Sequence, residues 1–155
     1  MRRITAAVFP ALAVMTMLFA ACMTHGPAEI HYGQDQCDYC KMTIADKEFG
    51  SELVTAKGKV YKFDSIECLA AYQMTSKLGA EDIHSMWVTD FSQPGSFLNI
   101  DRATIIASER QKSPMGVGLV AVNSPEHATR LIEVVGGSVL QWEQVRALVS
   151  ADWHL

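Results

Sequence analysis

Two cysteines and a methionine lie close together in the sequence, at Cys37, Cys40 and Met42. The spacing of the cysteines lets both sulfur atoms face one point when the chain between them turns. Thiolate and thioether sulfur bind soft metal ions, and a thioether favours Cu(I). Because Met42 follows Cys40 by two residues, an extended segment would project both side chains from the same side. These residues therefore predict a Cu(I) site.

The Cys-x-x-Cys spacing is also found in two other kinds of site. A structural zinc site needs a second pair of ligands, and the downstream candidates are Cys68 and the scattered histidines His84, His127 and His154. A thioredoxin-like redox pair opens a helix after a buried strand, whereas polar residues precede Cys37. Copper is our leading interpretation, with zinc binding and thiol redox chemistry as the alternatives.

Further residues are candidates for the same site. Asp35 could orient the thiols or bind a harder second metal ion through oxygen, or it could be a solvated loop charge. Met115 stands between Pro114 and Gly116, on an expected turn and not on an apolar helix stripe, so core packing explains it less well. Cys68 is ambiguous, because free cysteine is among the most buried residue types.

The N-terminal residues predict export. The basic pair Arg2-Arg3 precedes an almost wholly apolar run over 6–21, as in a secretory signal. Phe19-Ala20-Ala21-Cys22 resembles a bacterial lipobox, although leucine is usual where Phe19 stands. A soluble secreted form is the alternative, and a membrane span is disfavoured because the run is shorter than the ~20 residues required. We expect a lipoprotein signal over 1–21, a tether lipid-anchored at Cys22 over 22–34, and a copper-binding domain over 35–155.

Charge and cysteine count exclude several classes of protein. Without Arg2 and Arg3, 11 basic residues face 17 acidic ones, a net charge of −6, so nucleic acid is an unsuitable partner. If Cys22 carries lipid, three of the four cysteines are left, an odd number in an oxidising compartment. A pure disulfide scaffold is thereby disfavoured, while a Cys37–Cys40 bridge in a metal-free form stays open. No catalytic constellation is recognisable, so we expect no enzyme activity.

Short strands and helices alternate along the domain. Asp64 or Ser65 is positioned to cap the first helix, and Ser124-Pro125 the second. A similar element order in the two halves suggests an α+β fold of two small related lobes, roughly 35–92 and 93–155. The expected strands are 51–55, 59–63, 85–91, 97–100, 103–108, 117–122 and 139–140, and the expected helices 66–78, 125–135 and 141–149.

Five sequence blocks occur in a characteristic order. They are Cys22 after the signal, Asp35-x-Cys37-x-x-Cys40-x-Met42, Gly58-Lys59-x-Tyr61-x-Phe63-Asp64-Ser65-x-Glu67-Cys68, Pro114-Met115-Gly116 and Gly136-Gly137. Together they resemble the NosL family, the lipoprotein accessory factors of nitrous oxide reductase maturation. The resemblance covers essentially the whole chain after the signal.

This resemblance implies a periplasm-facing Cu(I) chaperone for the copper centres of nitrous oxide reductase. Its implied partners are the reductase and a membrane ABC-type transporter with a periplasmic component. The implied fold is two related α+β lobes, similar to a lobe of the organomercurial lyase MerB. Metal-site roles carry over to Cys40 and Met42, with Cys37, Asp35 and Met115 as further candidates.

Several points stay open at this stage. Lys41 stands where glycine is common in the family, so we expect a less sharply bent loop. A second metal ion, a homodimer, and anchoring in the inner or the outer membrane are not distinguished. The alternative functions are a thiol oxidoreductase or MerB-like enzyme using Cys37 and Cys40, and a scaffold lipoprotein that binds no metal.

Overall fold

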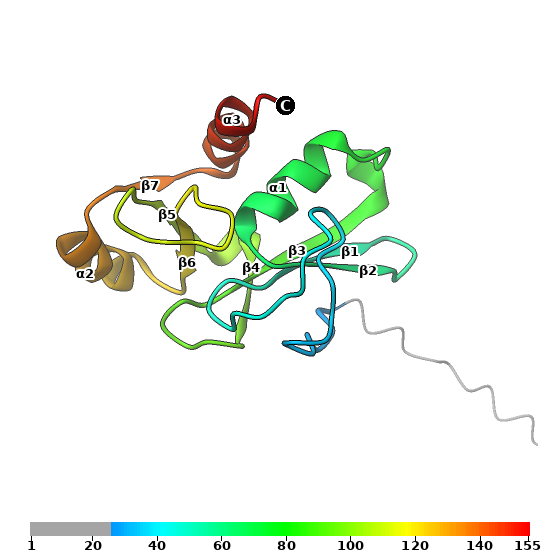
Figure 1. Cartoon of the computed structure of the whole chain (residues 1–155), viewed down its shortest axis with the longest axis horizontal. Helices are drawn as coiled ribbons and strands as arrows, with labels where there is room; N and C mark the ends of the chain where they lie inside the picture. The colour runs from blue at the N-terminus through cyan, green and yellow to red at the C-terminus, as the bar shows by residue number, and fades with distance from the viewer. Residues whose placement is uncertain (1–25) are drawn as a thin grey trace, which may run out of the picture.

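The computed structural model describes residues 26–155, which form two small antiparallel sheets and three α-helices (Figure 1). The predicted α+β fold is confirmed. The first sheet has the strand order β2-β1-β3-β4 and the second β6-β5-β7. The strands are β1 (Ser51–Thr55), β2 (Val60–Phe63), β3 (Ile83–Thr89), β4 (Phe97–Asn99), β5 (Thr104–Ala107), β6 (Leu119–Val122) and β7 (Ser138–Leu140).

Helix α1 (Ile66–Thr75) follows the β1–β2 hairpin and begins at Ser65, whose side chain accepts a hydrogen bond from the Cys68 N–H. Ile66 and Leu69 are buried beneath it. The short 3₁₀ helices η1 (Ala80–Asp82) and η2 (Ile100–Arg102) precede β3 and follow β4. The first helix therefore starts directly where the hairpin ends, because a serine N-cap supplies the missing acceptor.

The other two α-helices flank the last strand, β7, in the sequence, and α2 packs on the second sheet. Helix α2 (Pro125–Val135) begins after the N-cap Ser124, as predicted, and ends at Gly136, whose φ of 68° suits glycine. Helix α3 (Trp142–Trp153) packs against α1 (Figure 1). The C-terminal helix thus joins the second sheet to the helix of the first.

The two halves share one hydrophobic core. Ile105 and Leu119 of the second sheet and Val145 of α3 lie in the same buried cluster as Leu53 and Cys68. The first sheet also continues past the expected lobe boundary at residue 92, because β4 pairs with β3. The halves therefore support each other through this shared cluster, while a smaller buried cluster around Ile106, Val120 and Ala128 lies mainly in the second half.

Residues 26–34, expected as part of the tether, lie against the first sheet. Ile30 is buried, and the Ala28 N–H donates a hydrogen bond to Glu52 Oε2 over 2.8 Å. The expected signal and the lipidation residue Cys22 lie outside the described residues. Between residues 26 and 155, no helix is both long and apolar enough to cross a membrane.

Candidate metal site

The two cysteines of the Cys-x-x-Cys motif lie in a tight loop over residues 36–43, which we call the thiol loop. A bridge between Gln36 and Thr43 closes its base, and the Lys41 N–H donates to the Cys37 carbonyl over 3.0 Å. Lys41 has a φ of 66°, in the left-handed region that favours glycine. Our expectation of a less sharply bent loop was therefore wrong: the loop bends as it would with glycine, at a cost of about 1–2 kcal/mol.

Strand β2 holds the thiol loop in place. The Asp38 N–H donates to the Lys62 carbonyl over 2.8 Å, and the Lys62 N–H donates back to Asp38 Oδ2 over 2.8 Å. The Lys62 ammonium also reaches Asp35 Oδ2 over 2.7 Å. These contacts satisfy an exposed edge of the first sheet and fix the loop beside the start of α1.

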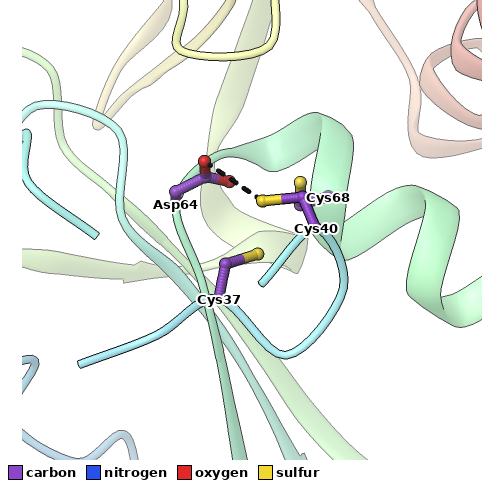
Figure 2. A group of neighbouring side chains, drawn as sticks. All are labelled: Cys37, Cys40, Asp64 and Cys68. Carbon is purple, nitrogen blue, oxygen red and sulfur yellow. Dashed lines mark hydrogen bonds between the residues drawn. The ribbon is translucent and has the colours of Figure 1, made fainter. Parts of the chain in front are cut away.

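Four side chains converge between the thiol loop and α1 (Figure 2). Cys37 and Cys40 come from the loop, Asp64 from the residue after β2, and Cys68 from the first turn of α1. One ligand atom of each lies within 4.8 Å of all the others. Sulfur atoms bonded to one metal ion at about 2.3 Å lie at most about 4.6 Å apart, so small side-chain adjustments suffice. We call these residues the thiol cluster.

Asp64 and Cys68 are the members that sequence reasoning did not assign to the site. Ser65, not Asp64, caps α1, which leaves the Asp64 carboxylate to accept a hydrogen bond from Cys40 Sγ over 3.5 Å. Asp64 Oδ1 is buried with no hydrogen-bond partner among the described residues. One sequence signal could have placed both residues in the site: Asp64 directly follows the strand that ends at Phe63, and Cys68 lies three residues after the N-cap Ser65. One helical turn then brings Cys68 back beside Asp64.

The thiol cluster is electrostatically uneven. A hydrogen bond from the Cys68 thiol lowers the pKa of Cys37 to about 6, although burial acts in the opposite direction. Burial, followed by the neighbouring Cys37, raises the pKa of Cys40 to about 11. Cys68 also has a raised pKa because it donates to Cys37 and is buried. These shifts favour proton loss at Cys37 over proton loss at Cys40 and Cys68, and any thiol that still carries a proton loses it when it binds a metal.

Accessibility differs sharply within the cluster. Cys37 and Cys68 are fully buried, and Asp64 is 4% exposed. Cys40 is half-buried at the rim of the loop. All three cysteines are free thiols. A soft ion held here would have deep thiol ligands on one side and a single accessible thiol on the other.

Comparison with known proteins assigns the chain to a family. The NosL family model matches residues 27–149, which include the thiol loop, Asp64 and Cys68. The chain belongs to the NosL family. Its fold is similar to the crystal structure of the copper chaperone NosL from Shewanella denitrificans, with a TM-score of 0.66 and 23% identity over 77% of this chain and 94% of that one. None of the curated proteins compared with the chain matches it.

Within this NosL chain, the other predicted ligands lie outside the thiol cluster. Asp35 is held by the Lys62 ammonium and by the His31 N–H, which donates over 2.9 Å. Met42 is 55% exposed. We expected an extended segment that would project Met42 and Cys40 from the same side, but Lys41 between them has a left-handed backbone conformation. The ligand roles of Asp35 and Met42 stay predictions.

Met115 occupies an intermediate position in the NosL fold. It is half-buried and packs against the hydrophobic cluster that contains Cys37 and Cys68. No histidine of the described residues belongs to the thiol cluster. The protein therefore gathers the sulfur atoms of three cysteines, while Met42 is exposed and Met115 packs against the hydrophobic cluster that contains two of them.

Proposed function

We propose that this NosL-family chain binds Cu(I) at the thiol cluster and delivers it for assembly of the copper centres of nitrous oxide reductase. The convergence of three cysteine thiols, two from the thiol loop and one from α1, carries the proposal. Thiolates favour soft metal ions such as Cu(I) and zinc over hard cations. The family and the copper chaperone of similar fold support the same cargo.

Delivery requires that a bound ion be kept from solution and still be released to an acceptor. Buried Cys37 and Cys68 would hold Cu(I) from below, while half-buried Cys40 faces the rim of the loop. The exposed thioether of Met42 lies two residues further along the same loop. A thiolate or thioether of the acceptor protein could bind the ion on this open side before Cys40 dissociates from it, because a partner can reach ligands that lie on a surface loop.

The uneven accessibility favours metal binding over thiol–disulfide exchange. An attacking cysteine must be both accessible and ionised. Here the thiol with the lowered pKa, Cys37, is fully buried, while the accessible Cys40 has a pKa raised to about 11. The function is therefore proposed as transport of a metal ion and not as redox catalysis.

The proposed cellular setting follows the sequence. Lipid at Cys22 would anchor the protein on the periplasmic side of a membrane, near the ABC-type transporter and its periplasmic partner. Concentration near that transporter would favour transfer. The Asp64 oxygen at the thiol cluster would be the donor for a harder second metal ion. Whether two copies act together is tested by the oligomeric state with and without copper.

The first test is an anaerobic Cu(I) titration of reduced residues 23–155 against a competing chromogenic chelator, for the wild type and Cys40→Ala. We expect near-stoichiometric tight binding that weakens strongly in the variant. Transfer is then measured as copper gained by apo nitrous oxide reductase. Weak binding by the wild type, or affinity unchanged in Cys40→Ala, would refute the proposal.

A further inference from the structure

A fully buried carboxylate lies next to the thiol cluster without belonging to it. Glu67 precedes Cys68 in the first turn of α1 and is 0% exposed. Successive side chains leave a helix about 100° apart, so the two neighbours point in different directions. Cys68 points to the thiol loop, and Glu67 contacts the loop over residues 108–118, which joins β5 to β6.

Glu67 binds this second loop through Ser113. The Ser113 hydroxyl donates a hydrogen bond to Glu67 Oε1, and the Leu119 N–H lies 3.5 Å from the same oxygen. Ser113 Oγ in turn accepts from the Gly118 N–H over 2.9 Å. In Figure 1 the yellow loop between β5 and β6 reaches the start of α1. Through the Glu67 carboxylate, the loop between β5 and β6 is therefore hydrogen-bonded to α1 next to Cys68.

The attached segment is the turn that carries Met115. The Gly116 N–H donates to the Ser113 carbonyl over 3.1 Å, which places Pro114 and Met115 at the centre of a four-residue turn. Gly116 has a φ of 88°. Because Ser113 opens this turn, its hydrogen bond to Glu67 sets where the thioether of Met115 lies. Met115 is half-buried against the cluster that includes Cys37 and Cys68.

The two ends of the loop approach each other closely at its base. The Ser108 N–H donates to the Gly118 carbonyl over 3.1 Å, and a Cβ on Gly118 would lie 2.1 Å from the Ser108 carbonyl oxygen. The two strands are thus pinched together at the base. Beyond this base, the hydrogen bond from Ser113 to Glu67 ties the loop to α1, while Met115 and Val117 pack against the hydrophobic cluster.

We infer that Glu67 is a positioning residue for copper binding: through Ser113 it holds the Met115 turn against the hydrophobic cluster that contains Cys37 and Cys68. The inference rests on the proposed function and adds the residue that makes the second half of the chain part of the site. Helix α1 then organises both sides, with Cys68 supplying a thiol and Glu67 placing a thioether. Glu67 itself does not touch the ion.

The test is a double-mutant cycle in Cu(I) affinity, measured on reduced residues 23–155 by chelator competition. Ser113→Ala should weaken binding by about tenfold, the lower range for loss of a group that orients a ligand. Met115→Leu removes the thioether itself and should weaken binding at least as much. The double variant should bind no more weakly than Met115→Leu alone, since Ser113 acts through Met115. Glu67→Gln keeps an oxygen acceptor and should retain near wild-type affinity, whereas Glu67→Ala should resemble Ser113→Ala.

A matched control separates this role from general loosening. Ser92 Oγ also donates to a buried carboxylate, Asp90 Oδ1, over 2.6 Å in another loop, so Ser92→Ala should leave affinity unchanged. If Glu67→Ala fails to fold, the double-mutant cycle of Ser113→Ala and Met115→Leu still tests the inference. Losses that multiply in the double variant, no loss in Met115→Leu, or an equal loss in Ser92→Ala would overturn the inference while wild-type binding stays tight. Weak wild-type binding would instead overturn the proposed function and, with it, the inference.

Discussion

Asp38 and Lys62 are joined by two hydrogen bonds that run in opposite directions, one from each backbone N–H. Asp38 lies between the two cysteines of the thiol loop, and Lys62 is the residue two before Asp64. This pair therefore sets the distance between the loop thiols and the part of the site that follows β2. Preorganised ligands bind a metal more tightly because less ordering is needed on binding.

Replacing Asp38 should weaken copper binding without removing any ligand. Asp38→Ala removes the acceptor for the Lys62 N–H and should lower Cu(I) affinity by about tenfold, the lower range for second-shell changes. Asp38→Asn keeps an oxygen acceptor and should bind nearly as well as the wild type. Chelator competition measures both variants. Equal affinities in Asp38→Ala and the wild type would show that the loop is held by other contacts.

Cys68→Ala tests whether the buried thiol of α1 belongs to the site. The sulfur is fully buried within the cluster, so we expect Cu(I) affinity to fall at least as strongly as in Cys40→Ala. Loss of this small buried group should also reduce the free energy of unfolding by about 1 kcal/mol. Ala70→Gly, in the same buried turn, is the control for helix destabilisation, since glycine costs about 1 kcal/mol there. Affinity preserved in Cys68→Ala would restrict the site to the thiol loop.

Aromatic stacking between Tyr39 and Trp153 should protect Cys40 from reagents. The rings lie 5.8 Å apart between centroids with planes 15° from parallel, so the end of α3 covers the thiol loop. Trp153→Ala should raise the rate of Cys40 alkylation by about two- to tenfold, which corresponds to the 0.5–1.5 kcal/mol of such a pair. Mass spectrometry after timed alkylation locates the modified thiol. Trp87→Ala, on β3, serves as the control, and an equal acceleration there would contradict a local role for the stack.

Glu52 should make the stability of the protein depend on pH. Burial raises its pKa from 4.5 to about 7, against the opposing hydrogen bond from Ala28. The folded state therefore binds a proton that the unfolded state has lost between about pH 4.5 and 7. The contribution of Glu52 to the free energy of unfolding is therefore fully present below about pH 4.5. It falls as the pH rises from about 4.5 to 7, by at most about 1.4 kcal/mol per pH unit.

The measurement is the free energy of unfolding by denaturant at several pH values. Glu52→Gln should flatten the decline toward pH 7, because an amide does not ionise. Glu48→Gln changes an exposed carboxylate and should leave the wild-type slope. A decline that persists unchanged in Glu52→Gln would assign it to other groups.

Much of the local structure could be read from short sequence signals. Ser124-Pro125 predicted the start of α2, and Gly136 its end, because capping and glycine conformations are properties of a few neighbouring residues. The blocks around Cys37 and Cys68 also pointed to the NosL family, which the match over residues 27–149 confirms. Such signals are local, so they survive without knowledge of the folded chain.

The membership of the metal site was less predictable. Asp64 and Ser65 both suit a helix cap, and only the folded backbone shows that Ser65 takes this role while Asp64 faces Cys40. Met42 was expected beside Cys40, yet the left-handed Lys41 leaves its side chain 55% exposed. One backbone dihedral decides the direction of the following side chain, and residue type alone does not specify that angle.

The sequence by itself determined which chemical groups this protein can use: soft sulfur side chains, an expected export signal, and a chain that folds into short strands and helices. Tertiary structure decided which of these side chains meet, because Cys68 of α1 lies beside Cys37 of the thiol loop, which Asp38 and Lys62 join to β2. It also brought Ser113 to Glu67 across 46 residues of sequence. Contacts of that separation depend on the packing of a shared core, which no local pattern encodes.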